Sequence, residues 1–235
     1  MSVLRIVATP IGNLEDITLR ALRVLDESSY ILCEDTRVTK KLLDHYKIKT
    51  PTISFHQHSG DIKVEKIMCL LKEGNDLALV TDAGTPGISD PGSKLVGIVR
   101  NEIGEQVLIE SVPGVSAITT AISIAGPGFD RFVFLGFLPH KKGRQKMISS
   151  ISSLDYPVVL YESKHRVIKL LKELESLAKK ENLVIDVSLA RELTKMYESF
   201  ISGPPEKLRK ALENNPSMQK GEFVVLIKTN PKKDE

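Results

Sequence analysis

The sequence contains no tryptophan, and aromatic residues make up only 5% of its 235 residues. Large flat ligands are usually held against several aromatic rings, so this composition disfavours a protein built to hold a macrocycle. Only two cysteines occur, Cys33 in a predicted strand and Cys69 in a predicted helix. Because they form no metal-ligand spacing, we expect two buried free thiols in a reducing compartment, with no zinc site and no disulfide.

Long apolar runs are also missing, since the longest fall well short of the roughly 20 residues that span a bilayer. Residues 1–8 (MSVLRIVA) lead directly into a predicted strand and lack the basic start and cleavage site of a signal peptide. We therefore expect a cytoplasmic protein that has no membrane association. A hydrophobic content of 41% and a charged content of 27% are typical of a soluble protein with a sizeable core.

The net charge of +3 is compatible with a nucleic-acid partner but does not require one. Cationic residues gather in the segment His140-Lys141-Lys142-Gly143-Arg144-Gln145-Lys146 and in Lys232-Lys233. These clusters suit phosphate groups without sequence preference, or they are a solvated loop and a frayed tail. The first cluster follows Gly136-Phe137-Leu138-Pro139, which ends a predicted strand and should fix the loop in place.

Short strands alternate with helical patterns in the first half, which predicts βαβ units and a mainly parallel sheet. The predicted strands are 4–8, 30–33, 52–55, 76–81 and 106–109, and the predicted helices lie near 15–26, 38–45, 61–73, 91–103 and 114–124. Residues 125–130 (AGPGFD) contain two glycines and a proline and are the expected domain junction. With a boundary near residue 120, we expect an N-terminal domain of residues 1–120 and a C-terminal domain of residues 121–235.

The second half has a different pattern, with two long helical segments and one short one between its strands. Its predicted strands are 132–135, 158–161, 184–189, 197–202 and 222–228. Strands 184–189 and 197–202 are too close in sequence for a helical crossover, so they should be antiparallel. The sequence therefore predicts an α/β protein with a mainly parallel N-terminal sheet and a mixed C-terminal sheet, and with a disordered end at 230–235.

Ligands of open α/β sheets bind beyond the carboxyl ends of the strands. Four segments occupy such positions, namely 9–18 (TPIGNLEDIT), 34–37 (EDTR), 81–92 (TDAGTPGISDPG) and 112–117 (VPGVSA). In the first, which is not the dinucleotide-binding glycine fingerprint, Gly12 allows a tight turn and Asp16 is available as a helix cap. The third has three glycines and two prolines, which predict a rigid loop that presents backbone donors and acceptors to a polar small molecule.

Each segment also has a purely structural interpretation. Asp90 and Pro91 suit the start of a helix, and residues 112–117 suit either a cofactor at a helix N-terminus or simple packing. In residues 34–37, Thr36 is a possible helix cap and Glu34–Arg37 a possible ion pair, although charged clusters at strand ends are also frequent in sites. The pair His56-Gln57-His58 lacks a carboxylate or cysteine at ligand spacing, so we expect no metal site there.

Taken in order, these segments resemble the tetrapyrrole methylase superfamily and, within it, the ribosomal RNA small subunit methyltransferase I family. The similar blocks span the chain from its first strand to its last. They are residues 9–14 (TPIGNL), 34–37 (EDTR), 82–86 (DAGTP), 89–92 (SDPG), 136–139 (GFLP), 161–166 (YESKHR), 190–195 (ARELTK) and 220–222 (KGE). Many members of that family continue into a small helical extension, whereas this chain stops shortly after its last strand.

The resemblance implies two α/β domains, a homodimer, and S-adenosylmethionine bound in the cleft between the domains. It also implies 2′-O-methylation of a cytidine in the decoding region of 16S ribosomal RNA within the small subunit. By their place in the family's cofactor blocks, the residues implied to hold the cofactor are Ile11, Gly84, Thr85, Ile88, Ser116 and Ala117 in one half, and Tyr161 and Ala190 in the other. Tyr161 is alternatively a buried aromatic residue at a strand end.

Methyl transfer to a hydroxyl group is an in-line displacement that needs alignment and removal of the hydroxyl proton. The charged residues of the blocks are the catalytic candidates, namely Glu34, Arg37, Lys164, Arg191 and Glu192, with Asp35 and Glu162 beside them. Each of them is alternatively part of a structural ion pair. His165 and Arg166 either cap a helix or contact phosphate. Two rival functions are methylation of a tetrapyrrole ring and ribosome binding without turnover.

Overall fold

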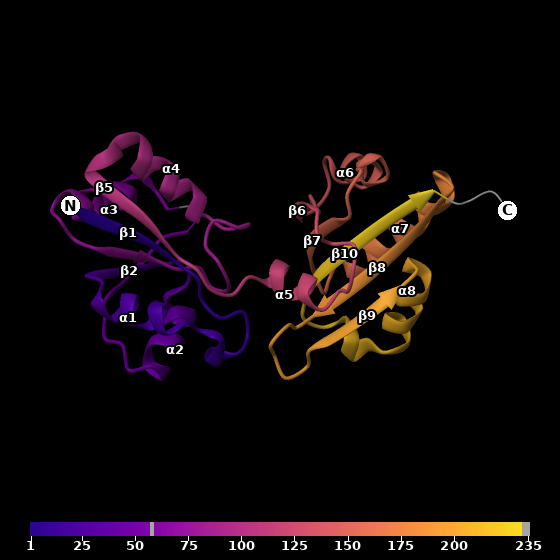
Figure 1. Ribbon diagram of the computed structural model, residues 1–235, viewed down its shortest axis with the longest axis horizontal. Helices are drawn as coiled ribbons and strands as arrows, with labels where there is room; N and C mark the ends of the chain where they lie inside the picture. Colours follow the sequence, from indigo (N-terminus) through magenta and orange to yellow (C-terminus); the bar gives the residue numbers. More distant parts are fainter. Residues whose placement is uncertain (57–58, 232–235) are drawn as a thin grey trace. The chain divides into compact units, whose positions relative to one another are not determined.

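The computed structural model describes residues 1–56 and 59–231. The chain divides into two compact units, Met1–Ser116 and Ala117–Glu235, and each unit contains one five-stranded sheet (Figure 1). The glycine-rich stretch 125–130, which the sequence marked as the junction, lies inside the second unit. Instead, the chain leaves the first unit directly after its last strand, along the segment that leads into a short helix.

The first unit is built on a parallel sheet, as predicted, with the strand order β3-β2-β4-β1-β5. Its strands are β1 (Ser2–Val7), β2 (Tyr30–Cys33), β3 (Thr52–Ser54), β4 (Leu77–Leu79) and β5 (Val107–Val112). The central strand β4 consists only of buried residues, because helices cover both faces of the sheet.

The helices of the first unit are divided between the two faces of its sheet. Helices α1 (Leu19–Glu27) and α2 (Thr36–His45) pack on one face, and α3 (Asp61–Lys72) and α4 (Gly92–Glu102) pack on the other (Figure 1). Each helix buries one apolar stripe, represented by Leu25 and Leu43 on the first face and by Leu71 and Leu95 on the second. A short 3-10 helix, Gly104–Gln106, leads into β5.

Three helix starts differ from the prediction, two of them because other side chains cap the helix. In place of the expected helix 15–26, the structure has a 3-10 turn, Leu14–Asp16, followed by α1. The cap of α1 is Thr18 and not Asp16, since Thr18 Oγ1 accepts a hydrogen bond from Ala21 N at 3.0 Å. Helix α2 is capped by Asp35 and not by Thr36. The expected helix 114–124 begins only at Ala117, because the chain passes close over β1 before it, where a Cβ atom on Gly114 would lie 2.9 Å from Ala8 Cβ.

The second unit has a mixed sheet, as predicted, with the strand order β6-β7-β10-β8-β9. Its strands are β6 (Val133–Phe137), β7 (Val158–Ser163), β8 (Leu183–Arg191), β9 (Ser199–Gly203) and β10 (Glu222–Pro231). Strands β6 and β7 are parallel and the other neighbours antiparallel, which confirms the antiparallel pair β8–β9. Strand β10 includes Asn230 and Pro231, which we had expected to be disordered; Lys232 and Lys233 lie outside the described residues.

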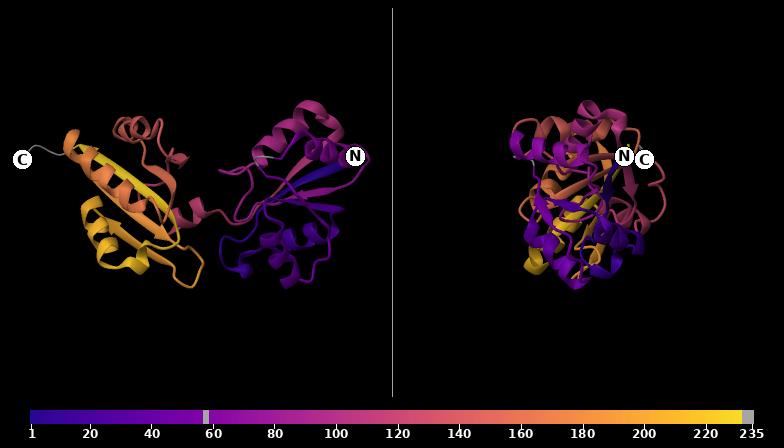
Figure 2. Two further views of the ribbon diagram at one scale, coloured as in Figure 1. Left: turned by 180° about the vertical axis from the view of Figure 1, so that it is seen from behind. Right: turned by 90° about the vertical axis from the view of Figure 1, so that its left-hand side faces the viewer.

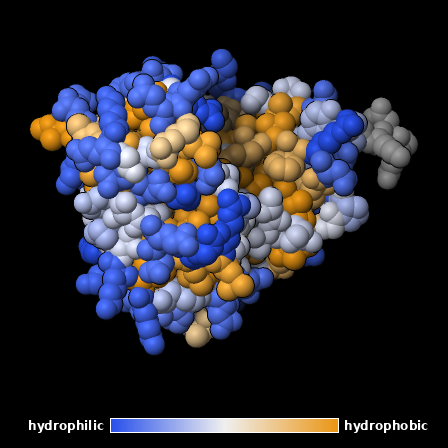
Figure 3. Space-filling view, turned by 60° about the vertical axis from the view of Figure 1, so that its left-hand side comes forward, coloured by the Kyte–Doolittle hydropathy of each residue, from blue (hydrophilic) through white to orange (hydrophobic). Residues whose placement is uncertain are grey.

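Helices cover one face of the second sheet and leave part of the other face to aromatic side chains. The core of the covered face is formed with α6 (Arg144–Ser150), α7 (Val167–Lys180) and α8 (Pro205–Asn214), and Figure 2 shows α7 in orange against the sheet. The 3-10 helices Ile151–Ser153 and Pro216–Gln219 follow α6 and α8. Helix α5 (Ala117–Ser123) contacts β10. On the face of the molecule shown in Figure 3, hydrophilic side chains predominate and apolar ones show between them in patches.

The two cysteines differ in their environment. Cys33 is a buried free thiol, as predicted, and burial raises its pKa, so the thiol stays protonated. The prediction that Cys69 is buried was wrong, because it lies on the solvent side of α3. In the described part of the chain, no helix combines the length and the apolar character needed to cross a membrane.

Candidate functional site

The connections of the first sheet reverse direction between two neighbouring strands. From β1 the chain runs through α1 toward β2, whereas from β4 it runs through α4 on the opposite face toward β5. Strands β1 and β4 are adjacent, so the loops that follow them part at their carboxyl ends. Open α/β sheets bind ligands at such a point, which makes this edge of the first unit the candidate site.

Hydrogen bonds join the loops after β1, β4 and β5 into one surface. Thr9 and Gly84 exchange two backbone hydrogen bonds, each 3.0 Å long, which link the first loop to the second. Thr9 Oγ1 also donates to Thr81 O at 3.1 Å, and Thr85 Oγ1 donates to Val115 O at 3.0 Å, which links the second loop to the third. The three loops are therefore fixed relative to each other before any ligand binds.

The carboxylate of Asp90 closes the loop after β4 on itself. It accepts hydrogen bonds from the backbone N–H groups of Gly87 at 2.7 Å, Ile88 at 2.9 Å and Gly92 at 2.7 Å. Ser89 has a positive φ of 65°, which is rare for a residue that is not glycine. These hydrogen bonds hold the loop together and occupy three of the backbone donors that the sequence predicted for a ligand. Asp90 is not the N-cap residue of α4, because Pro91 occupies that position.

Five of the eight predicted cofactor residues lie on this surface of the first unit, namely Ile11, Gly84, Thr85, Ile88 and Ser116. Gly84 is their meeting point, since a Cβ atom there would lie 3.3 Å from Ile11 Cγ2 and 3.7 Å from Val115 O. Its positive φ of 83° also favours glycine. The other three residues, Ala117, Tyr161 and Ala190, belong to the second unit.

In the second unit, Tyr161 and Ala190 both pair with Val224, so they occupy one row across β7, β10 and β8. Neighbouring residues along each strand point into the core under the helices, so this row belongs to the opposite face of the sheet. Tyr161 is half-buried there and packs against Phe134 and Phe137, with ring centroids 5.1 and 5.3 Å away. Phe134 was not predicted from the sequence to belong to the site, because the register of β6 shifts between Phe134 and Phe137 and no regular spacing relates the two rings.

Carboxylates gather at the edge where β2 and β4 end. The backbone N–H of Asp35 donates to Asp82 Oδ1 at 3.0 Å. Asp35 forms an ion pair of 2.6 Å with Arg37, whose hydrogen bonds lower the pKa of Asp35 to about 2. The ion pair we considered between Glu34 and Arg37 is therefore wrong in its acidic partner, and the guanidinium group of Arg37 stays 88% exposed.

Glu34 has the most unusual electrostatics of the predicted catalytic residues. Burial raises the pKa of this half-buried carboxyl group, and the negative charges of Asp82 and Asp90 raise it further, while a hydrogen bond with Thr81 lowers it. A carboxylate with a raised pKa is a better proton acceptor than an ordinary one. Glu34 therefore has the properties of a general base at the edge of the loop surface.

The structure buries the predicted catalytic neighbour Glu162 completely. Its carboxylate lies 2.7 Å from Arg166 Nε and 3.5 Å from Arg144 Nη1, and Arg144 forms a second ion pair of 2.8 Å with Glu173. The expectation that Arg144 belongs to an exposed cationic loop was wrong, since its side chain is only 2% exposed. Lys141, Lys142 and Lys146 of that cluster are exposed.

From the sequence, Arg166 and His165 were expected either to cap a helix or to contact phosphate. The structure places the two residues in different environments. Arg166 occupies the N-cap position of α7 without a capping hydrogen bond from its side chain, and its guanidinium group donates to Leu138 O at 2.8 Å besides contacting Glu162. Its side chain is thus used within the unit, whereas His165 and the neighbouring catalytic candidate Lys164 are exposed. Lys164 directly follows the end of β7, where a substrate has access to it.

Arg191 and Glu192 hold the loop between β8 and β9. The guanidinium group of Arg191 donates to three backbone carbonyl oxygens, those of Lys220 at 2.6 Å, Tyr197 at 2.9 Å and Ser217 at 3.1 Å. Burial raises the pKa of Glu192, but hydrogen bonds from Glu222 N and Lys195 outweigh it, and the net pKa is lowered. A carboxylate with a lowered pKa is a poor proton acceptor.

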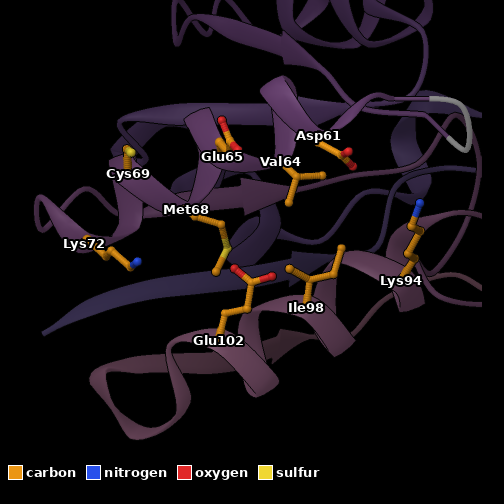
Figure 4. Close-up of a pocket in the computed structure, with 9 residues that line it drawn as sticks. All are labelled: Asp61, Val64, Glu65, Met68, Cys69, Lys72, Lys94, Ile98 and Glu102. Atoms are coloured by element: carbon orange, nitrogen blue, oxygen red, sulfur yellow. The ribbon is translucent and has the colours of Figure 1, made fainter.

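A separate groove of about 340 Å³ lies between α3 and α4 (Figure 4). Val64, Met68 and Ile98 supply its apolar lining, and acidic and basic side chains surround them. It shares no residue with the predicted site and lies beside the helices, away from the loops that end the strands. In residues 1–56 and 59–231, no group of three or more His, Cys, Asp or Glu side chains is placed to hold a metal ion; Gln57 and His58 fall outside these ranges.

The loop surface fits S-adenosylmethionine, the cofactor that the family resemblance implies. Gly84 has no side chain where the three loops meet, which lets Ile11 and Val115 pack closely against its backbone and brings the predicted cofactor residues of this unit together. The carboxylates of Glu34, Asp82 and Asp90 influence one another electrostatically and make this edge negative. A negative edge suits a cofactor that carries a positively charged sulfonium group and an ammonium group.

Comparisons with known proteins agree on the fold and the family. The family model described as Tetrapyrrole (Corrin/Porphyrin) Methylases matches residues 3–209. Among solved structures, the methyltransferase CobJ covers the whole chain with a TM-score of 0.70 and 17% identity, and 97% of CobJ is covered. A second solved structure is that of uroporphyrin-III C-methyltransferase from Thermus thermophilus complexed with S-adenyl homocysteine. The match has a TM-score of 0.64 and 16% identity, and it covers 96% of this chain and 97% of that protein. These likenesses show the fold.

Curated relatives are much more similar in sequence. Ribosomal RNA small subunit methyltransferase I of Haemophilus influenzae is 41% identical over 99% of this chain and 80% of the relative. The protein of that name from Thermotoga maritima is 40% identical over 97% of this chain and 98% of the relative. The chain therefore belongs to the tetrapyrrole methylase family and, within it, to the ribosomal RNA small subunit methyltransferase I family.

Proposed function

We propose that this protein transfers the methyl group of S-adenosylmethionine to the ribose 2′-hydroxyl of a cytidine in the decoding region of 16S ribosomal RNA, within the small subunit. The observation that carries the proposal is the surface of three hydrogen-bonded loops at the carboxyl ends of β1, β4 and β5, in a chain of this family. The proposal includes a cytoplasmic location, because the relatives are named for ribosomal RNA, and a homodimer, which the family resemblance implies.

In this proposal, the cofactor binds to the eight residues that the family resemblance implies. Ile11, Gly84, Thr85, Ile88 and Ser116 contribute from the first unit, and Ala117, Tyr161 and Ala190 contribute from the second. The cofactor supplies a methyl group on a positively charged sulfur. Because hydrogen bonds already fix the loops, ordering them on cofactor binding costs little free energy. Fixed loops also favour alignment of the reacting atoms.

Glu34 is the residue we assign as general base. When the ribose hydroxyl accepts the methyl group that the bound cofactor would supply, the Glu34 carboxylate would take up the hydroxyl proton. The raised pKa supports this role, since the conjugate acid of a useful base must hold the proton it receives. Arg37 and Lys164 are exposed cations, and we assign them to the phosphates beside the target nucleotide.

Arg191 and Glu192, which the sequence analysis also counted as catalytic candidates, receive a positioning role in this proposal. Their polar atoms are engaged by backbone groups and by Lys195 within the second unit. The exposed residues Lys141 and Lys142 add a second, sequence-independent contact to RNA phosphates.

Methylation with labelled S-adenosylmethionine tests the proposal. The protein is incubated with assembled small subunits, with naked 16S ribosomal RNA or with a uroporphyrinogen-type ring, and the labelled product is digested with alkali. We expect label on one cytidine whose 3′ phosphodiester bond resists alkali, because a 2′-O-methyl group blocks cleavage. Label on a nucleobase would contradict the ribose assignment. Label on the ring but never on RNA would refute the proposed substrate, and no binding of the cofactor at millimolar concentration would refute the enzyme itself.

A further inference from the structure

The loop between β8 and β9 displays two adjacent apolar side chains to solvent. Met196 is 89% exposed and Tyr197 is 69% exposed, which makes them the two most exposed large apolar residues among the described residues of the second unit. Scattered apolar residues on a surface need no explanation, but two neighbours at the tip of a loop form a small contact surface. We call Met196 and Tyr197 the hairpin tip.

Side-chain contacts at the base of the loop hold the hairpin tip in place. Arg191 Nη1 donates to the carbonyl oxygen of Tyr197 at 2.9 Å, and the same guanidinium group binds the carbonyl oxygens of Lys220 and Ser217. Lys195 Nζ bridges Glu192 at 3.1 Å and Glu222 at 2.8 Å. The exposed pair is therefore presented by a fixed loop and not by a loosely attached one.

The backbone at the base of this loop is unusual. Glu192 and Thr194 have positive φ values of 49° and 65°, although neither is glycine. Such conformations persist where the surrounding contacts impose them, and they are concentrated at functional sites and ligand contacts. The contacts of Arg191 and Glu192 thus maintain a conformation that brings apolar side chains to the surface, which a loop selected for stability alone would avoid.

The charges around the hairpin tip are compensated within the loop. Lys195 contacts two carboxylates, and Glu198 accepts a hydrogen bond from Thr194 N. The tip consequently offers a flat ring and a polarisable thioether, without the excess of positive charge that binds phosphates. Its contact area is limited to two side chains, far below the roughly 800 Å² per partner of a stable protein–protein interface.

We propose that the hairpin tip is a stacking platform for an unpaired nucleobase adjoining the methylated nucleotide. This inference rests on the proposed function, because it takes ribosomal RNA as the substrate. Proteins that recognise RNA by sequence bind its single-stranded parts, where unstacked bases stack on aromatic side chains. Every nucleobase has a flat face, so Tyr197 serves this purpose without requiring net charge.

The absence of tryptophan from the chain allows a direct test. The variant Tyr197→Trp contains a single tryptophan, and stacking on a base should quench its fluorescence when naked 16S ribosomal RNA is added. Tyr156→Trp is the matched control, since Tyr156 is 44% exposed and precedes β7, at the opposite end of the strands from the hairpin. We expect quenching for Tyr197→Trp and an unchanged emission for Tyr156→Trp. Equal responses of the two variants would overturn the inference.

Kinetics with small subunits give a second readout. Loss of one base–aromatic stack should lower kcat/KM by about 5- to 150-fold in Tyr197→Ala, with Tyr197→Phe and Tyr156→Ala near the wild type. The affinity for S-adenosylmethionine and the salt dependence of RNA binding should stay unchanged, because the platform carries no charge. An unaltered kcat/KM in Tyr197→Ala would overturn the inference, as would conversion of a dimer to a monomer, which would show that the tip contacts a second copy.

The two assays also separate this inference from the proposed function. Wild-type protein that methylates no ribosomal RNA refutes the proposed function, whatever the variants do. Wild-type protein that methylates RNA while Tyr197→Ala does so equally well refutes only the stacking platform.

Discussion

Replacement of Arg144 by methionine should destabilise the second unit strongly, although the residue belongs to a sequence that looks like an exposed basic loop. Its side chain is 2% exposed and lies between Glu173 at 2.8 Å and Glu162 at 3.5 Å. Arg166, 2.7 Å from Glu162, completes a group of two cations and two anions. The group is electrically balanced, which is the condition under which buried charges are tolerated.

The size of the effect follows from what Arg144→Met leaves behind. The two carboxylates would then keep only Arg166, beside Glu162, and the exposed Lys169, 3.9 Å from Glu173, and removing one partner of a buried ion pair costs about 3–5 kcal/mol. Glu162 keeps Arg166 and a hydrogen bond of 2.8 Å from Ser163 N, and Glu173 keeps one of 3.0 Å from Gln145. These remaining contacts place the expected loss of unfolding free energy near the lower end, at about 3 kcal/mol. For a domain of this size, that lowers Tm by about 10 °C.

Urea denaturation of four proteins provides the assay: the wild type, Arg144→Met, Glu173→Gln and the double variant. Because the double variant again balances the charges, its loss should be smaller than the sum of the single losses by about 1–3 kcal/mol. Lys142→Met, an exposed neighbour, should change stability by less than about 0.5 kcal/mol. A loss below about 1 kcal/mol in Arg144→Met, or strictly additive losses, would refute the reasoning.

Three further predictions concern the proposed site. Thr85→Trp should abolish binding of S-adenosylmethionine in calorimetry and leave Tm unchanged, because the loop lies outside the sheet; unchanged affinity would remove the loop from the site. Because the pKa of Glu34 is raised in the folded protein, protonation of Glu34 stabilises the folded state at pH values below the ordinary pKa of a glutamate. This stabilisation is lost as the pH rises through the pKa of Glu34 in the folded state. Glu34→Gln should therefore lower kcat about 100-fold or more while Tm at pH 7 stays equal or rises, and a parallel loss of stability would contradict the role of base. Replacing Lys141, Lys142 and Lys146 by alanine should flatten the salt dependence of RNA binding without affecting cofactor affinity, and an unaltered slope would exclude them from the interface.

The prediction from sequence succeeded where local pattern decides the structure. Strand β2 was predicted at residues 30–33, where it is found, and the antiparallel pairing of β8 with β9 followed from the short connection between them. Helix starts were less accurate, because several residues near a start are able to cap it. Thr18 and Asp35 supply the caps, whereas Asp16 and Thr36 are equally suitable by residue type.

In the candidate site too, the features set by local sequence pattern were predicted and the others were not. A loop rich in glycine and proline after a buried strand indicated the ligand surface, and in the structure the carboxylate of Asp90 holds this loop together. The environments of the charged candidates were not predictable, because each depends on residues far away in the chain. Arg191 binds the carbonyl oxygen of Lys220, and Glu34 feels the charge of Asp82, across separations that no local pattern records.

The sequence by itself therefore determined the order and type of the elements, the two sheets and the loops that end the parallel strands. These follow from periodicity and turn chemistry, which act between near neighbours in the chain. Only the tertiary structure decided which side chains are accessible. It buried Arg144 against Glu173 and left Tyr197 exposed on a loop held by Arg191. The physical reason is that the free energy of a charge depends on burial and on the partners that the fold brings within a few ångströms.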